Sequence, residues 1–106
     1  MNPRIRSILA ELRSRFEALY GDRLVKLILY GSQARGDADA DSDIDVLVVL
    51  KGQVNVGQEI ERGSTVSAAL SLEHNVVISC VYMSEDRYRQ DRIPLLLNIE
   101  AEGVPV

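Results

Sequence analysis

Hydrophobic positions change their spacing along the chain, and the spacing predicts helices that alternate with strands. Apolar residues recur every three or four positions between Ile5 and Leu19. Asn2 and Pro3 precede them and suit a helix start, so we expect a helix that ends at Gly21. Continuous apolar runs at residues 24–30, 44–50 and 76–82 predict three largely buried strands. This alternation predicts an α/β fold.

The remaining helices follow from their capping residues. Asn55 opens a pattern that predicts a helix to about Leu72. Ser84 can cap a last helical stretch that Pro94 interrupts or restarts and that Gly103 ends. We therefore expect a small mixed sheet of three or more strands, with helices packed mainly on one face.

Length and composition narrow the class of protein. With 106 residues and 46% apolar positions, the chain predicts one domain over residues 1–106 with a real core. No apolar run approaches the roughly 20 residues that span a bilayer, so we expect no membrane partner and a cytoplasmic location. The net charge of -4 gives no support for nucleic-acid binding. The single cysteine, Cys80, is expected to pack as a small hydrophobic residue.

Five aspartates alternate with other residues between positions 37 and 45. The first three, Asp37, Asp39 and Asp41, resemble the start of a calcium loop. Such a loop needs Gly at its sixth position and Glu at its twelfth, where this chain has Ser42 and Val48. We therefore expect these three residues to form a solvated acidic turn.

The last two aspartates predict a site. The segment between the first two strands is too short for a parallel crossover, which favours antiparallel pairing. That pairing brings Gly31 and Ser32 to the same sheet edge as Asp43 and Asp45. Because side chains alternate along a strand, the two carboxylates share one face while Ile44 points into the core.

Two such carboxylates favour a cation between them. Their repulsion at 4 Å is about 4 kcal/mol at an effective dielectric constant near 20. An oxygen-only donor set suits Mg²⁺, with Mn²⁺ as an alternative, together with substrate phosphates. Gly31 allows close approach of the backbone, and Ser32 offers a hydroxyl and an N–H to a phosphate. Arg35 either adds a positive charge to the same phosphates or only solvates the turn.

Gly31-Ser32, ten intervening residues and Asp43-Ile44-Asp45 resemble the signature of the DNA polymerase beta-like nucleotidyltransferases. The run from Tyr30 to Leu50 is similar to the minimal nucleotidyltransferase members in particular. The resemblance implies transfer of a nucleoside monophosphate from ATP or another triphosphate to a hydroxyl. It also implies that Asp43 and Asp45 are the catalytic residues and bind the metal. It also implies a toxin–antitoxin context, with a helical HEPN-type protein as partner. A homo-oligomer is the alternative assembly.

One departure from the family concerns a third carboxylate, which active members bring to the metal from a later strand. The corresponding strand of this chain contains no Asp or Glu, and Ser79 or Ile78 takes the place. Glu73 and Glu85 flank the strand and would have to reach in from its ends. Three functions remain open: a nucleotidyltransferase, a catalytically weak or inactive nucleotide-binding partner, and a structural subunit.

Other polar and aromatic residues are interpreted as structural. His74 lies between a helix and a strand without a visible catalytic partner. The four tyrosines are expected in the core or at its rim.

Overall fold

The computed structural model describes residues 2–39 and 42–106. Its elements run in the order α1 (Pro3–Tyr20), η1 (Gly21–Arg23), β1 (Leu24–Tyr30), α2 (Ser32–Arg35), β2 (Ile44–Leu50), α3 (Val56–His74), β3 (Ile78–Ser84), α4 (Glu85–Gln90), α5 (Pro94–Glu102) and β4 (Val104–Pro105). The fold is α/β, as the sequence predicts.

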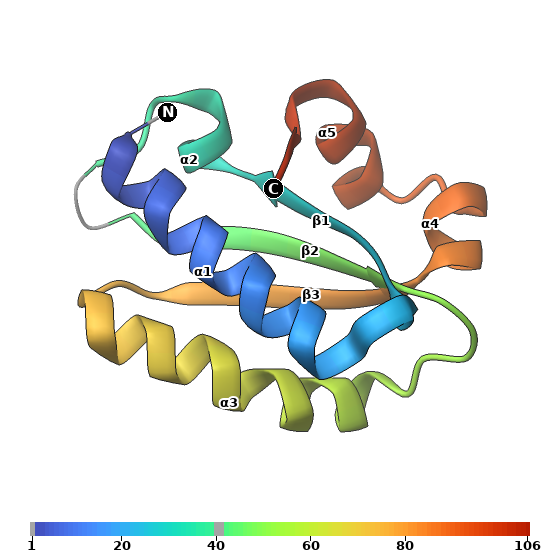
Figure 1. Ribbon diagram of the computed structural model, residues 1–106. Helices are drawn as coiled ribbons and strands as arrows, with labels where there is room; N and C mark the ends of the chain where they lie inside the picture. The colour runs from blue at the N-terminus through green and yellow to red at the C-terminus, as the bar shows by residue number, and fades with distance from the viewer. Residues whose placement is uncertain (1, 40–41) are drawn as a thin grey trace.

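The strands form one mixed sheet in the order β3-β2-β1-β4 (Figure 1). β1 and β2 are antiparallel, with Tyr30 opposite Asp45, so the pairing expected from the short link is confirmed. β2 and β3 are parallel, with Asp45 opposite Ser79. β4 pairs antiparallel with β1 at Ile28 and Leu29.

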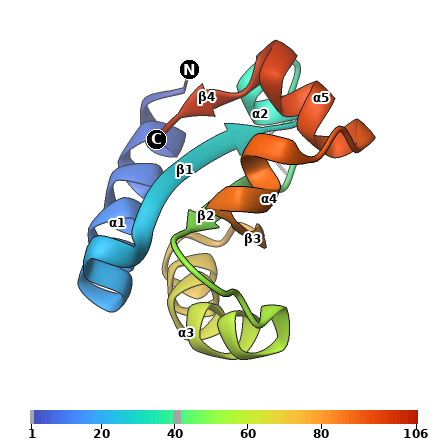
Figure 2. The ribbon, with the colours of Figure 1, turned by 90° about the vertical axis from the view of Figure 1, so that its right-hand side faces the viewer.

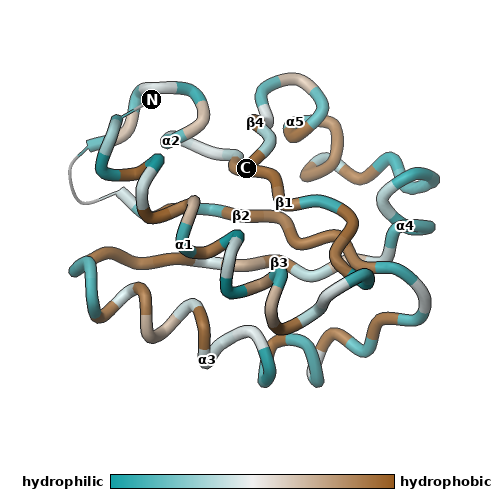
Figure 3. Tube along the Cα trace, viewed as in Figure 1, coloured by the Kyte–Doolittle hydropathy of each residue, from teal (hydrophilic) through white to brown (hydrophobic). Residues whose placement is uncertain are grey.

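The two long helices, α1 and α3, cover one face of the sheet (Figure 2). Leu29 and Val46 of the sheet pack in one cluster with Phe16 of α1 and Leu70 of α3. On the other face, α5 contributes a smaller cluster through Leu96 and Ile99, together with sheet residues such as Leu47. Apolar residues accordingly concentrate along the strands, whereas the helices alternate between apolar and polar residues (Figure 3). Most of the helical cover therefore lies on one face, as expected.

Helix boundaries follow the predicted caps. The side-chain oxygens of Asn2, Asn55 and Ser84 accept hydrogen bonds from backbone N–H groups of the helices that they precede. Pro94 restarts the chain as α5, and Gly103 ends that helix. The third strand lies two residues later than predicted, at Ile78–Ser84 instead of 76–82.

Two further expectations concern Cys80 and the membrane. Cys80 packs against the core beside β2, and burial raises the pKa of its thiol to about 12, so it is a packing residue and not a reactive one. Among the described residues, the helices include none that is long and apolar enough to span a bilayer.

Candidate functional site

Gly31 holds the backbone against a carboxylate at the end of β1. Its φ of 77° and ψ of -157° belong to a region that is accessible almost only to glycine. A Cβ atom placed on Gly31 would lie 2.7 Å from Oδ2 of Asp45. The glycine therefore gives both the conformation of the turn and the space that the Asp45 side chain occupies.

The start of β2 presents two aspartates on either side of a core residue. Ile44 is fully buried, Asp43 is exposed and Asp45 is partly buried. The Ile44 N–H donates to the carbonyl of Val77 at 2.8 Å, which fixes the start of the strand beside the segment that leads into β3. Burial and the neighbouring Asp43 carboxylate raise the pKa of Asp45, an effect that Arg35 opposes. The two carboxylates are thus close enough to repel each other.

Ser32 begins the single turn of α2, directly after Gly31. The Gly31 carbonyl accepts from the N–H groups of Ala34 and Arg35, both at 3.1 Å. Within a helical turn the first N–H groups lack helical partners, so the turn leaves donors beside the Ser32 hydroxyl. The Gln33 amide donates to the Ser42 carbonyl at 3.4 Å and ties this turn to the chain that enters β2.

Arg35 lies between two carboxylates. Its Nε donates to Asp37 at 3.2 Å, and its Nη1 donates to Glu102 of α5 at 3.1 Å. Both carboxylates raise the pKa of Arg35, Asp37 more strongly than Glu102. Since Arg35 also lowers the pKa of Asp45, its positive charge acts on the carboxylate pair. Arg35, the predicted phosphate-binding residue, therefore lies near the Asp43 and Asp45 carboxylates, and Glu102 is a site neighbour that sequence reasoning missed.

The residue of β3 that faces Asp45 is Ser79. Paired residues of adjacent strands share a face, and Asp45 pairs with Ser79. Ile78 is 7% exposed and packs in the core cluster beneath α1 and α3, so it faces away from the site. Of the two positions left open by the sequence, Ser79 is therefore the one on the face of Asp45, and its side chain carries no charge.

The two glutamates that flank β3 do not fill this role. Glu73 accepts hydrogen bonds from Arg15 of α1 at 3.2 Å. Glu85 pairs with Arg89 at 2.9 Å, at the end of β3 that is remote from Asp45. Neither flanking glutamate therefore reaches the Asp43 and Asp45 carboxylates.

His74 connects the two long helices. Its Nε2 lies 3.2 Å from Oε2 of Glu11, and its carbonyl accepts a hydrogen bond from the Arg4 guanidinium. Glu11, Glu73 and His74 offer ligand atoms within 4.8 Å of one another. These side chains already have partners across the helix interface, which agrees with the structural interpretation of His74.

The acidic turn is described only in part. The hydroxyl of Ser42 accepts from the Asp39 N–H at 2.9 Å, and Asp37 is engaged by Arg35. Asp41, which completes the calcium-like pattern, lies outside the described residues.

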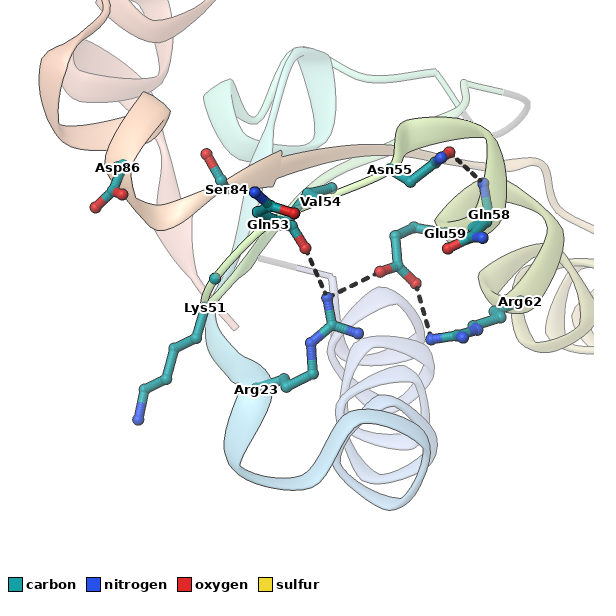
Figure 4. Close-up of a pocket in the computed structure, with 11 residues that line it drawn as sticks. Arg23, Lys51, Gln53, Val54, Asn55, Gln58, Glu59, Arg62, Ser84 and Asp86 are labelled. Carbon is teal, nitrogen blue, oxygen red and sulfur yellow. Dashed lines mark hydrogen bonds and ion pairs between the residues drawn. The ribbon is translucent and has the colours of Figure 1, made fainter.

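A large cavity of about 1100 Å³ lies at the opposite end of the sheet (Figure 4). Its lining includes Glu59, whose side chain is 3% exposed and which accepts from Arg23 at 3.0 Å and pairs with Arg62 at 3.6 Å. Burial and this carboxylate raise the pKa of the nearby Tyr20 to about 12. A buried charge with two arginines is compensated within the fold, so this cluster is best interpreted as a structural ion-pair network.

The fold and the signature define a class of protein. Residues 5–96 match the model of the nucleotidyltransferase domain. The chain therefore belongs to the nucleotidyltransferase domain family. Over 72 residues it is 33% identical to a Methanocaldococcus jannaschii protein described as a candidate protein adenylyltransferase. The matched region covers 68% of this chain and 72% of the relative.

Solved structures show the same fold. A candidate minimal nucleotidyltransferase superposes with a TM-score of 0.62 at 22% identity, over 95% of this chain and 94% of the other. A candidate nucleotidyltransferase from Sulfolobus solfataricus gives 0.58 at 21% identity, over 99% and 86% of the two chains. A chain of a toxin–antitoxin structure with AMP-PNP gives 0.63 at 17% identity, over 89% and 68%.

Proposed function

We propose that this domain binds a magnesium-bound nucleoside triphosphate, with ATP preferred, and transfers its nucleoside monophosphate to a hydroxyl of an acceptor. The observation that carries the proposal is the close placement of Gly31 against Asp45, beside a second carboxylate and the Ser32 turn. The assignment of ATP and of a protein acceptor draws on the adenylyltransferase relative and on the AMP-PNP complex of a structural neighbour.

The residues present fit a hard divalent cation. Asp43 and Asp45 supply only oxygen donors, and burial and then the neighbouring Asp43 carboxylate raise the pKa of Asp45, so a bound cation would favour its charged form. Arg35 is the cation that acts on this pair, but it is already shared with two other carboxylates. A bound Mg²⁺ would neutralise the pair and supply charge stabilisation to the phosphates, and Mn²⁺ is the expected substitute.

The other residues of the site would bind and orient the triphosphate. The Ser32 hydroxyl and the first N–H groups of its turn donate to phosphate oxygens, and Arg35 adds a guanidinium. In the transfer, the acceptor oxygen forms a bond to the α-phosphorus, the bond to the β-phosphate oxygen breaks, and pyrophosphate leaves. The acceptor proton passes to solvent.

A protein partner is part of the proposal. Toxin–antitoxin structures among the fold neighbours support an assembly of this kind, with a HEPN-type helical protein or a second copy of this chain as the other member. The acceptor hydroxyl is expected on the partner, because one relative is described as a candidate protein adenylyltransferase. ATP as substrate agrees with the cytoplasmic location expected from the sequence.

Ser79 favours a second candidate function. The family resemblance implies three metal-binding carboxylates in active members, whereas this site supplies two. The residue opposite Asp45, Ser79, is neutral. A domain with this site binds the nucleotide and transfers it slowly, or serves its partner through binding alone.

Titration calorimetry with ATP tests the binding site directly. We expect binding with Mg²⁺, much weaker binding in EDTA, and loss in the Asp43→Ala/Asp45→Ala double variant. Asp22→Ala/Asp86→Ala removes the same charge from exposed positions elsewhere and should bind as the natural chain does. Equal affinity with and without the metal, or in the two double variants, would refute the proposed site.

Radiolabelled ATP then separates the reaction classes. Label at the α-phosphate should appear on the partner protein, while label at the γ-phosphate should appear only in pyrophosphate. Binding without transfer of either label would support the second candidate. Transfer of the γ-label would instead show a kinase and exclude both.

A further inference from the structure

Glu102 joins a remote part of the chain to the candidate site. Its carboxylate accepts from Arg35 Nη1 at 3.1 Å across a sequence separation of 67 residues. α2 and α5 lie together above the end of β1 in both ribbon views (Figures 1 and 2). We propose that Glu102 is a positioning residue that holds the Arg35 guanidinium at the triphosphate site.

The surroundings of Glu102 make it a firm anchor. It is the last residue of α5, a helix fixed to the sheet by Leu96 and Ile99, which are 7% and 3% exposed. The next residue, Gly103, turns directly into β4, and a Cβ there would lie 2.5 Å from the Ile99 carbonyl and 2.8 Å from Ile28. The backbone at Glu102 therefore has little freedom, because packing restrains it on one side and a glycine-dependent turn on the other.

Asp37, the other partner of Arg35, is a weaker anchor. Its side chain is 62% exposed, compared with 29% for Glu102. It also follows Gly36, which adopts a left-handed conformation in the exposed loop before β2. Asp37 raises the pKa of Arg35 more strongly, but an ion pair that is more shielded from water is screened less, and Glu102 is held by a packed helix. The position of the Arg35 guanidinium therefore depends mainly on Glu102.

Arg35 keeps donors for a ligand in this arrangement. A guanidinium has five N–H groups, and the two hydrogen bonds to Asp37 and Glu102 use two of them. The remaining donors can contact phosphate oxygens without loss of the anchor. A carboxylate that fixes one edge of an arginine reduces the conformational entropy that the side chain loses when a phosphate binds.

The sign of the effect distinguishes positioning from simple electrostatics. Removal of a negative charge near a polyanion site should tighten triphosphate binding if Glu102 acts only through its field. Positioning predicts the opposite, because Arg35 loses its anchor. This inference rests on the proposed function, since Arg35 must contact the nucleotide.

A double-mutant cycle measured by calorimetry with Mg²⁺ and ATP tests it. We expect Glu102→Ala to weaken binding about three- to tenfold, and Arg35→Ala to weaken it about tenfold or more. In the Arg35→Ala background, Glu102→Ala should cause no further loss. Glu100→Ala removes an exposed carboxylate from the same helix and should leave the affinity unchanged.

Each outcome has one meaning. Unchanged or tighter binding by Glu102→Ala would overturn the positioning role. A loss that persists fully in the Arg35→Ala background would also overturn it, because it would show damage to α5 that does not act through Arg35. If the natural chain binds ATP and the Asp43→Ala/Asp45→Ala variant does not, either of these results overturns the role of Glu102 but leaves the proposed function intact. If the natural chain does not bind, both proposals fail together.

Discussion

Substitution of Gly31 by alanine should damage the site through one defined clash. The added Cβ would lie 2.7 Å from Oδ2 of Asp45, whereas ordinary contacts begin at 3.4 Å. The carboxylate must then move by at least about 0.7 Å, more than the ~0.5 Å to which a functional constellation must be held. The backbone adds strain, because φ of 77° with ψ of -157° costs a residue with a side chain about 1–3 kcal/mol.

Gly52 provides a matched control for the backbone strain. Its φ is 76°, nearly that of Gly31, but a Cβ there would meet nothing within 4 Å. Gly52→Ala should lower the free energy of unfolding by about 1–2 kcal/mol in urea titrations and leave Mg²⁺-dependent ATP binding unchanged. Gly31→Ala should be at least as unstable and should lose about tenfold or more in ATP affinity, equivalent to about 1.4 kcal/mol. Native affinity in a folded Gly31→Ala protein would show that Asp45 does not need the position seen here.

Three further results are expected. The raised pKa of Asp45 means that its protonated form favours the fold, so its contribution to stability is present in acid and is lost as the pH rises through that pKa. Asp45→Asn should therefore be more stable than the natural chain in metal-free buffer at pH 7 and lose this advantage in acid, as thermal unfolding across pH would show; equal melting at every pH would contradict this. Ser79→Asp should raise transfer of the α-label at least about tenfold, whereas Ile78→Asp should mainly lower the melting temperature; no gain from Ser79→Asp would mean that charge is not the missing element. Arg23→Ala should cost about 2 kcal/mol in urea unfolding because buried Glu59 loses its nearer partner, and Glu59→Gln should cost less; the reverse order would refute the ion-pair interpretation.

The main elements could be predicted because each has a strong local signal. The helix that starts at Pro3 has both an apolar repeat and a side-chain cap at Asn2. The pairing of β1 with β2 follows from the length of the link between Gly31 and Asp43, which leaves room for one helical turn but not for a crossover. Position-specific features of this kind act over a few residues, so a single sequence reveals them.

Other features depend on contacts between distant segments. β4 has two residues and forms because Gly103 lets the chain turn beside Ile28 of β1. No local sequence pattern predicts this strand. The Arg35–Glu102 pair joins residues 67 positions apart, and an acidic residue near a helix end is otherwise ordinary. The place of Ser79 opposite Asp45 required the register of β3, which the apolar run left uncertain by one residue.

The charges of the site suggest that binding and chemistry make different demands on it. The carboxylates proposed to hold the cation are Asp43 and Asp45, and the serine that pairs with Asp45 adds no charge. Two carboxylates suffice for a cation that arrives with its triphosphate, since the phosphates supply the remaining oxygen ligands. Activation of an acceptor hydroxyl depends on additional negative ligands, because these must be in place before the acceptor binds. A partner that brings both the hydroxyl and a carboxylate would complete the site, so transfer should then appear only in the assembled complex.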